Sequence, residues 1–167
     1  LFGFLTAFFL LAVLCFHKLG VSPVQDWDEA RHGVSAYEML QTGEPIVTTW
    51  AYKPDYWNFK PPLSEWFITL GYKLLGYNAW GLRFYSACSI FLTAILSSVF
   101  VWKRYGKIES LFTLFSFSAC APLFASHCGR HGDADALYIL FYTCAVLFLC
   151  IFSQHHTALY GACLCFA

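Results

Sequence analysis

Asp26-Trp27-Asp28-Glu29-Ala30-Arg31 places four charged side chains within six residues of a chain that has few charges elsewhere. Charged residues make up 12% of the 167 positions and hydrophobic residues 59%, whereas an ordinary soluble domain is about 25% charged. Seven of the ten acidic residues fall between positions 20 and 80. Because ionisable groups at a bilayer are costly and mark function, we expect the chemistry of this protein in residues 20–80.

The apolar runs on both sides of residues 20–80 predict the fold. A helix that crosses a bilayer needs about 20 apolar residues, and suitable runs occupy 1–19, 82–102, 109–127 and 135–152, with a fifth starting near 157. The first run lacks the basic start and the small-residue cleavage site of a signal peptide, so we expect a retained span. The sequence predicts an all-α, polytopic transmembrane helical bundle. Since the chain starts without Met and ends inside an apolar run, residues 1–167 are expected to be the N-terminal part of one larger transmembrane domain.

Net charge and the positions of the cysteines argue against two classes of protein, nucleic-acid-binding proteins and disulfide-rich secreted domains. A formal net charge of zero argues against a nucleic-acid partner, which requires a basic surface to neutralise phosphates. All eight cysteines lie in or beside the apolar runs and none lies in residues 20–80. We therefore expect small buried thiols rather than the disulfide framework of a secreted domain.

Basic residues predict the orientation of the spans. Lys103, Arg104 and Lys107 stand between the second and third apolar runs, and the positive-inside rule places such a connection in the cytoplasm. Residues 20–80 and the short connection 128–134 then both face outward, on the same side of the membrane.

Two helices are expected within the outer connection 20–80. Asp26 and Glu29 are spaced as a capping box, and Gly43 and Pro45 end the helix that follows. A second helix can start at Pro61 or Pro62. Its apolar positions form one stripe, which indicates a helix lying on the outer leaflet: Leu63, Trp66, Phe67, Leu70 and Leu74. Residues 44–60 between the two helices are expected to be irregular.

Two adjacent acids and a lysine that precedes two prolines are the first candidates for residues of an active site. Asp28 and Glu29 stand at a helix N-terminus, where a purely structural role with the helix dipole, and with Arg31 paired to Asp28, is the alternative. Lys60 precedes two prolines and a helix, which gives its ammonium group a defined direction. A solvated interfacial lysine is the alternative at that position.

The segment from His127 to Asp135 is a third candidate. Its Asp133-x-Asp135 pattern is similar to the metal-binding acids of nucleotide-sugar transferases, and a metal cage is one reading, with ligands drawn from His127, Cys128, His131, Asp133 and Asp135. The other reading is a polar turn whose acid caps the next helix. No clear ligand set emerges, so no metal or other cofactor is assigned, although a divalent ion remains open.

Taken together, these motifs resemble the lipid-linked-sugar glycosyltransferases of the GT-C fold, above all the bacterial branch of the protein O-mannosyltransferase and aminoarabinose transferase superfamily. The resemblance rests on Asp28-Glu29-Ala30-Arg31 after the first span and on Met39-Leu40-Gln41-Thr42-Gly43. It continues with Lys60-Pro61-Pro62-Leu63 before an aromatic helix and with Asp135 at the start of the fourth span. These motifs follow one another in the family's order over almost the whole chain.

The resemblance implies inverting transfer of a sugar from a polyprenyl-phosphate donor to a lipid, glycan or protein acceptor. It implies a multi-pass protein in the lipids of a bacterial inner membrane, with its active site facing outward. Asp28 would be the general base or the acid that orients the acceptor. Glu29 and Asp135 are the further catalytic candidates, and Asp135 would position substrate or brace the cationic groups. Lys60 would hold the donor phosphate, and the other expected substrate-binding residues are Arg31, Arg130 and Asp133.

One position departs from the family pattern. In the aminoarabinose branch an acid that can hold a metal precedes the Lys-Pro pair, and Phe59 stands here instead. This replacement argues against a metal at that point.

Two other function classes remain as alternatives: a transporter or channel subunit, and a non-catalytic membrane scaffold. A transporter usually has charges or broken helices in the middle of its spans, and the centres of the runs 82–102 and 135–152 contain neither proline nor acid. The enzyme hypothesis predicts instead that Asp28, Lys60 and Asp135 converge at one outer-face cavity, with Arg130 or His131 as further cations.

Overall fold

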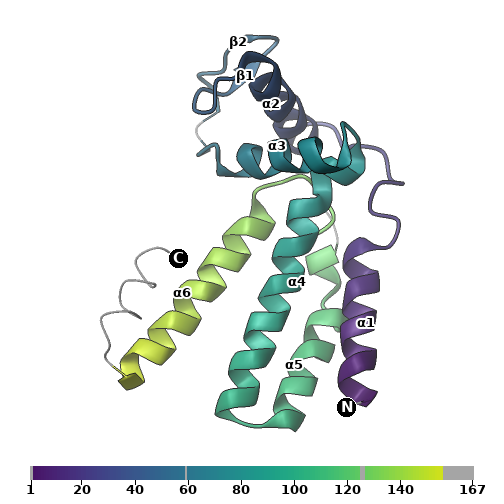
Figure 1. The fold of residues 1–167 in the computed structure, drawn as a ribbon, viewed down its shortest axis with the longest axis vertical. Helices are drawn as coiled ribbons and strands as arrows, with labels where there is room; N and C mark the ends of the chain where they lie inside the picture. The colour runs from purple at the N-terminus through teal and green to yellow at the C-terminus, as the bar shows by residue number, and fades with distance from the viewer. Residues whose placement is uncertain (1, 59, 125–126, 156–167) are drawn as a thin grey trace.

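The computed structural model describes residues 2–58, 60–124 and 127–155, and this part of the chain is mostly helical (Figure 1). The helices are α1 (Phe2–Phe16), α2 (Asp28–Thr42), α3 (Leu63–Leu75), α4 (Ala79–Arg104), α5 (Lys107–Ala119) and α6 (Asp135–His155), with a short 3₁₀ helix at Ala121–Phe124 and strands β1 (Thr49–Trp50) and β2 (Lys53–Pro54).

Within the described residues, two helices are long and apolar enough to cross a membrane, α4 and the part of α6 from Asp135 to Ser153. The apolar helix α1 is shorter, with 15 residues. Where the sequence predicts a span over 109–127, α5 has 13 residues and ends at Ala119. Pro122 explains this early end, because proline lacks an N–H and disfavours helical geometry in the residue before it. The predicted fifth run, from 157, lies outside the described residues.

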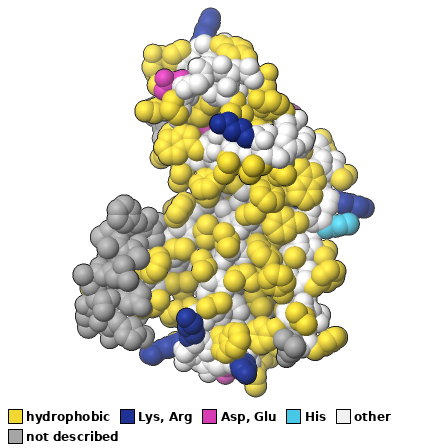
Figure 2. All heavy atoms as spheres, in the orientation of Figure 1, with side chains coloured by type: hydrophobic (Ala, Val, Ile, Leu, Met, Phe, Trp, Pro, Cys, Tyr) yellow, Lys and Arg dark blue, Asp and Glu magenta, His cyan; other side chains and the backbone are white. Residues whose placement is uncertain are grey.

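Helix α4 is the centre of the arrangement (Figure 1). It packs against α5, α6, α3 and α1, and α2, α3 and the β1–β2 hairpin form a layer at the end of α4 opposite the α4–α5 turn. Small residues allow this close packing: a Cβ at Gly71 of α3 would lie 2.1 Å from the carbonyl oxygen of Gly81 in α4. Figure 2 shows hydrophobic side chains over the face formed by α1, α4 and α5.

The two ends of α2 can be compared with the helix start and stop that the sequence predicts. Its C-terminus is as predicted: Gly43 adopts a left-handed conformation with φ of 74° and donates its N–H to the Met39 carbonyl. Its N-terminus differs, because Trp27 rather than Asp26 occupies the cap position and no side chain caps the helix there. Glu29 still accepts a hydrogen bond from the Gln25 N–H at 2.7 Å. Helix α3 begins at Leu63, one or two residues after the predicted start at Pro61 or Pro62, and Pro62 occupies its N-cap position.

The expectation that residues 44–60 are irregular is wrong at the β1–β2 hairpin. Thr49 pairs with Pro54 and Trp50 with Lys53, and Ala51 and Tyr52 between them both have positive φ. That geometry is the tight hairpin turn usually made by Asn-Gly, so the sequence carried no signal for it. The buried Glu38 of α2 holds the hairpin by accepting hydrogen bonds from the Thr49 hydroxyl and the Tyr52 N–H.

Helices α2 and α3 bury polar side chains and expose apolar ones. Buried positions of α2 include Glu29, His32, Ser35 and Glu38, and those of α3 include Ser64 and Glu65. Most of the predicted apolar stripe of α3 lies outside, with Trp66, Leu70 and Leu74 at 45%, 51% and 67% exposure. The interior of this layer therefore combines these buried polar groups with a small apolar cluster that includes Ala36 of α2 and Ile68 of α3.

Arg83 of α4 organises that interior, and its side chain is 1% exposed. Its Nε and Nη2 groups donate to the two carboxylate oxygens of Glu29, at 2.6 and 2.8 Å. Its remaining N–H groups donate to the carbonyl oxygens of Leu19, Ser22 and Pro23 at 2.8–2.9 Å. One guanidinium thus ties α4 to α2 and to the chain that leads from α1.

Replacing Arg83 by Met is expected to destabilise the fold by about 3–5 kcal/mol, because Glu29 then stays buried without a counter-charge. The matched control is Arg104→Met, since Arg104 is an exposed arginine at the other end of the same helix. Thermal unfolding of the full-length protein in detergent measures both variants. Equal melting temperatures for the two would contradict this role of Arg83.

Candidate active site

Asp133 lies at the centre of the candidate site and is 3% exposed. Its Oδ1 atom lies 3.5 Å from the ammonium nitrogen of Lys60 and 3.6 Å from Nε2 of His32. Its Oδ2 atom is 2.9 Å from Nδ1 of His127. Asp133 therefore joins three nitrogen-bearing side chains that come from α2, from the segment before α3 and from its own loop.

Backbone contacts fix the loop that carries Asp133. The Gly132 N–H donates to Oε1 of Glu29 at 2.9 Å, and the Tyr85 hydroxyl of α4 donates to the Asp133 carbonyl at 2.7 Å. Side chains are excluded at Gly132, where a Cβ would lie 2.6 Å from Leu82. These contacts confirm that the connections 20–80 and 128–134 meet at one end of the bundle.

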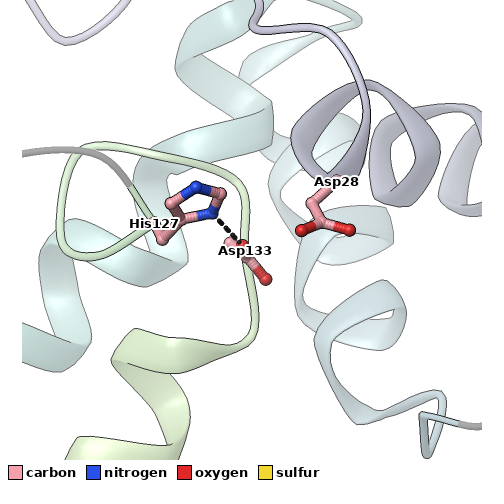
Figure 3. Close-up of side chains that lie close together, drawn as sticks. All are labelled: Asp28, His127 and Asp133. Atoms are coloured by element: carbon pink, nitrogen blue, oxygen red, sulfur yellow. Dashed lines mark hydrogen bonds and ion pairs between the residues drawn. The ribbon is translucent and has the colours of Figure 1, made fainter.

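Asp28 faces the same loop (Figure 3). One ligand atom from each of Asp28, His127 and Asp133 lies within 4.8 Å of the others. Asp28 is partly buried, and among the described residues its carboxylate makes no hydrogen bond or ion pair. The carboxylate is thus held beside Asp133 and left open to a ligand.

His32 is a buried cation between two acids. Its Nδ1 atom lies 2.7 Å from Oε1 of Glu65, which is itself fully buried. Burial alone would lower the pKa of His32, but hydrogen bonds to Asp133 and Glu65 outweigh it and raise the pKa to about 9. Burial would likewise raise the pKa of Glu65, and its bond to His32 lowers it instead.

The same competition keeps Asp133 ionised. Burial favours its neutral form, but the bonds from His32 and His127 and the charge of Lys60 hold its pKa well below the ordinary value. In return, the hydrogen bond to Asp133 raises the pKa of His127. Asp133 is therefore a stable anion that orders cations, and a weak proton acceptor.

Of the residues expected to converge, Asp28 and Lys60 meet, but they meet at Asp133 rather than at Asp135. Asp135 is exposed at the start of α6 and makes no hydrogen bond or ion pair with the described residues. The negative charges of Asp133 and Asp28 disfavour the ionised form of its carboxyl group, and the positive charges of Lys60 and His127 favour it. The alternating pattern of the Asp-x-Asp pair places one acid inside and one outside.

Three other sequence candidates have structural partners. Glu29 is buried and fully engaged: burial would raise its pKa, and bonds from Arg83, Gln25 and Gly132 lower it. Arg130 donates to the carbonyl oxygens of Leu14 and His17, at 2.8 and 2.9 Å, and so caps the end of α1. Arg31 pairs with Asp55 at 2.6 Å, and not with Asp28.

His131 is not the further cation that was expected. Its Nδ1 atom is buried without a hydrogen-bond partner among the described residues. Burial lowers its pKa, so the ring is neutral at pH 7.

Sequence reasoning missed Arg83, His32 and Glu65. Arg83 is a charge inside an apolar run, which is itself a signal. His32 follows Glu29 by three positions and so shares its helix face. Glu65 carried no signal of its own, because an acid in the first turn of a helix is ordinary.

A groove of about 380 Å³ opens beside Lys60, between the start of α3 and α6. Apart from Lys60 and Ser64, its lining is apolar or aromatic: Pro61, Leu63, Ala134, Leu137, Tyr138 and Phe141. We call this the Lys60 groove. It combines one cation with an apolar wall along α6, a helix that is long and apolar enough to cross a membrane.

The trio Asp28, His127 and Asp133 offers a divalent ion two carboxylates and an imidazole at suitable separations. Of the cage that the sequence suggested, it includes only His127 and Asp133. Lys60, His32 and His127 already supply positive charge to Asp133. The geometry fits an ion, but the charge at Asp133 is already balanced without one.

Comparison with known proteins identifies the family. Residues 59–167 match the family described as dolichyl-phosphate-mannose-protein mannosyltransferase. The chain belongs to this family. The resemblance seen in the sequence motifs is thereby confirmed.

Two proteins with similar sequences show how much of a longer relative this chain covers. The undecaprenyl phosphate-alpha-4-amino-4-deoxy-L-arabinose arabinosyl transferase of Pseudomonas savastanoi pv. phaseolicola is 34% identical over 115 residues, which are 65% of this chain and 20% of that protein. An uncharacterized protein of Aquifex aeolicus is 27% identical over 140 residues, 84% of this chain and 28% of that protein. The chain therefore spans between 20% and 28% of the length of these relatives.

The fold is similar to that of a solved membrane protein. The crystal structure of ArnT from Cupriavidus metallidurans bound to undecaprenyl phosphate matches with a TM-score of 0.77 and 23% identity, over 87% of this chain and 26% of that one. Its apo structure matches with the same TM-score.

Replacing His32 by Gln is expected to remove a pH-dependent part of the stability. The pKa of His32 rises from 6.5 to about 9 on folding, so its contribution is complete below about pH 6.5 and is lost as the pH rises through about 9. The shift corresponds to a contribution on the order of 3 kcal/mol at low pH. Unfolding curves at about pH 6 and about pH 10 should show a large gap between wild type and variant at the lower pH and a small one at the higher.

The control for this experiment is His17→Gln, since His17 is exposed after the end of α1. A gap between wild type and His32→Gln that does not change with pH would contradict a protonated His32.

Proposed function

We propose that this chain is the N-terminal part of a membrane glycosyltransferase that moves a sugar from a polyprenyl-phosphate donor to an acceptor at the outer face of a bacterial inner membrane. One observation carries the proposal: Lys60 and Asp28 both lie beside the buried Asp133. A cation for a phosphate and an unpaired carboxylate for a hydroxyl are the two groups that such a transfer needs.

The proposed reaction is a single displacement. An acceptor hydroxyl oxygen attacks the anomeric carbon and forms the new glycosidic bond, while the bond between that carbon and the phosphate oxygen breaks. The hydroxyl proton passes to Asp28, and the polyprenyl phosphate leaves with the electron pair. A positioned base of this kind contributes about 10²–10⁴-fold to a rate, and attack opposite to the leaving phosphate inverts the anomeric configuration.

The Lys60 groove supports a lipid-phosphate donor. The phosphate of such a donor would lie at Lys60, whose side chain is 47% exposed, and gain charge there as it leaves. Its isoprenoid chain would lie along Leu137, Tyr138 and Phe141. The structurally similar ArnT of C. metallidurans was crystallised with undecaprenyl phosphate, a lipid of this class.

The placement of the charges disfavours the two alternatives. A transporter would have its ionisable groups near the bilayer midplane, whereas those of α4 and α6 in the described residues lie near the helix ends. A scaffold has no need for a partly buried carboxylate without a partner among the described residues, such as that of Asp28. Membership of a glycosyltransferase family supports the enzyme as well.

Asp28→Asn is expected to lower sugar transfer by about 100-fold or more, because the amide keeps the size of the side chain and cannot accept the proton. The measurement is transfer of radiolabelled sugar in membranes that contain the full-length protein. Glu44→Gln, an exposed acid after α2, is the matched control and should leave the rate unchanged. Wild-type transfer by Asp28→Asn at equal expression would exclude Asp28 as the base.

Lys60→Ala is expected to weaken the use of the donor by about ten- to a hundredfold, since a charged hydrogen bond to phosphate is worth roughly 1.5–3 kcal/mol. Titration of the donor at fixed acceptor measures the change. Lys73→Ala removes an exposed lysine from the far end of α3 and serves as the control. An unaltered donor dependence in Lys60→Ala would count against a phosphate at this position.

A further inference from the structure

We propose that a second groove, lined by three tryptophans, binds a neutral saccharide ring of the acceptor. This tryptophan groove has a volume of about 500 Å³ and is lined by Asp26, Trp27, Ala30, Arg31, Trp50, Asp55 and Trp57. The inference rests on the proposed function, because it names the class of acceptor for the same site.

The tryptophans come from three separate segments that the fold brings together. Trp27 precedes α2, Trp50 lies on β1 and Trp57 follows β2, and their exposures are 83%, 49% and 75%. The axial C–H groups of a sugar ring form an apolar face that packs on an indole. Binding pockets of this type combine aromatic walls with a few fixed polar groups.

An ion pair supplies the polar groups. The Nε and Nη2 groups of Arg31 both donate to Oδ2 of Asp55, at 3.2 and 2.6 Å, and Oδ1 of Asp55 accepts the Trp57 N–H at 3.1 Å. Among the described residues, the Nη1 group of Arg31 makes no hydrogen bond. A planar array of N–H donors and carboxylate oxygens matches adjacent sugar hydroxyls, which both donate and accept.

The charge of the groove indicates a neutral ligand. Arg31 is already neutralised by Asp55, and Asp26 adds a further negative charge at the edge. A phosphate or carboxylate would be repelled there, whereas a neutral saccharide would not. The Lys60 groove, with one cation and an apolar wall, has the opposite character.

The position of the hairpin argues against a role for Trp50 as a membrane anchor. Anchoring tryptophans lie where the spans leave the bilayer. In Figure 1 the β1–β2 hairpin, which carries Trp50, lies at the extreme end of the molecule, beyond α3 and the end of α4.

The tryptophan groove also begins beside the proposed base. Trp27 immediately precedes Asp28, and Arg31 lies one helical turn after it on α2, so Arg31 and Asp28 are neighbours on the helix surface. Trp27 holds a φ of 77°, a strained conformation that is concentrated at functional sites. A saccharide in this groove would present a hydroxyl to Asp28, while the donor approaches from the Lys60 groove.

Binding of saccharides to the full-length protein in detergent tests the proposal without requiring turnover. The probes are methyl glycosides and disaccharides of glucose, galactose, mannose and N-acetylglucosamine, and the readout is tryptophan fluorescence. At least one probe should bind, and Trp50→Ala should weaken its binding by about tenfold, the loss expected for an aromatic contact. Trp50→Phe keeps an aromatic face and should retain most of the affinity.

The matched control is Trp102→Ala, since Trp102 has nearly the same exposure as Trp50, 48% against 49%, and lies at the opposite end of α4. It should bind the probe as wild type does. Absence of binding by every probe, or equal losses in Trp50→Ala and Trp102→Ala, would overturn the saccharide groove. Binding of a serine-rich peptide in place of the saccharides would overturn it in favour of a protein acceptor.

Failure of this proposal can be told apart from failure of the proposed function. If Asp28→Asn abolishes transfer but the tryptophan variants bind saccharides as wild type does, the enzyme assignment stands and the saccharide groove is wrong.

Discussion

The buried ion pair between Glu29 and Arg83 is the constraint on which the rest of the site depends. Both side chains are almost completely shielded from water, and a buried pair is stable only when its remaining donors and acceptors are also satisfied. Arg83 therefore takes the carbonyl oxygens of the chain between α1 and α2, and Glu29 takes the N–H of Gly132. These hydrogen bonds fix the α1–α2 connection, α2, α4 and the loop that contains Gly132 in one arrangement.

The residues next to this pair acquire their roles from it. Because Glu29 points into the bundle, Asp28, one residue earlier and about 100° around the helix, is directed toward the 127–134 loop. Because Gly132 is held against Glu29, Asp133 is directed toward Lys60 and His32. Asp28, the proposed base, and Glu29, the partner of Arg83, are thus adjacent in sequence. Their different roles follow from the directions in which the helix points them, and not from residue type.

The sequence predicted the features that depend on local chemistry. Apolar length was enough for α4 and α6, Pro61-Pro62 for the start of α3, and Gly43 for the end of α2. The meeting of Asp28 and Lys60 followed from topology together with the family resemblance. Pairings over long distances were out of reach, since nothing near Arg31 or Arg130 shows that their partners are Asp55 and the end of α1.

The hairpin, and the burial of Asp133 rather than Asp135, are further features that the sequence did not predict. Ala51 and Tyr52 adopt turn conformations that their own preferences disfavour, because Glu38 of α2 binds the hairpin from outside it. Asp133 and Asp135 are of the same type and differ only in what surrounds them, and the loop geometry decides that one is buried and the other exposed. Tertiary contacts determine both the hairpin turn and the burial of Asp133, so neither feature can be predicted from the spacing of residues in the sequence.

The cations around Asp133 explain why two adjacent acids do not compete for the same proton. Lys60, His32 and His127 all face Asp133 and lower its pKa, so it stays an anion and serves to hold Lys60 in place. Asp28 makes no hydrogen bond or ion pair with any described residue, although its charge helps to raise the pKa of the neighbouring His127. An ammonium group drawn to one carboxylate and a second carboxylate left free form a matched pair for a reaction in which a phosphate departs as a hydroxyl loses its proton. The division of labour between Asp28 and Asp133 is thus a consequence of which acid the buried cations reach.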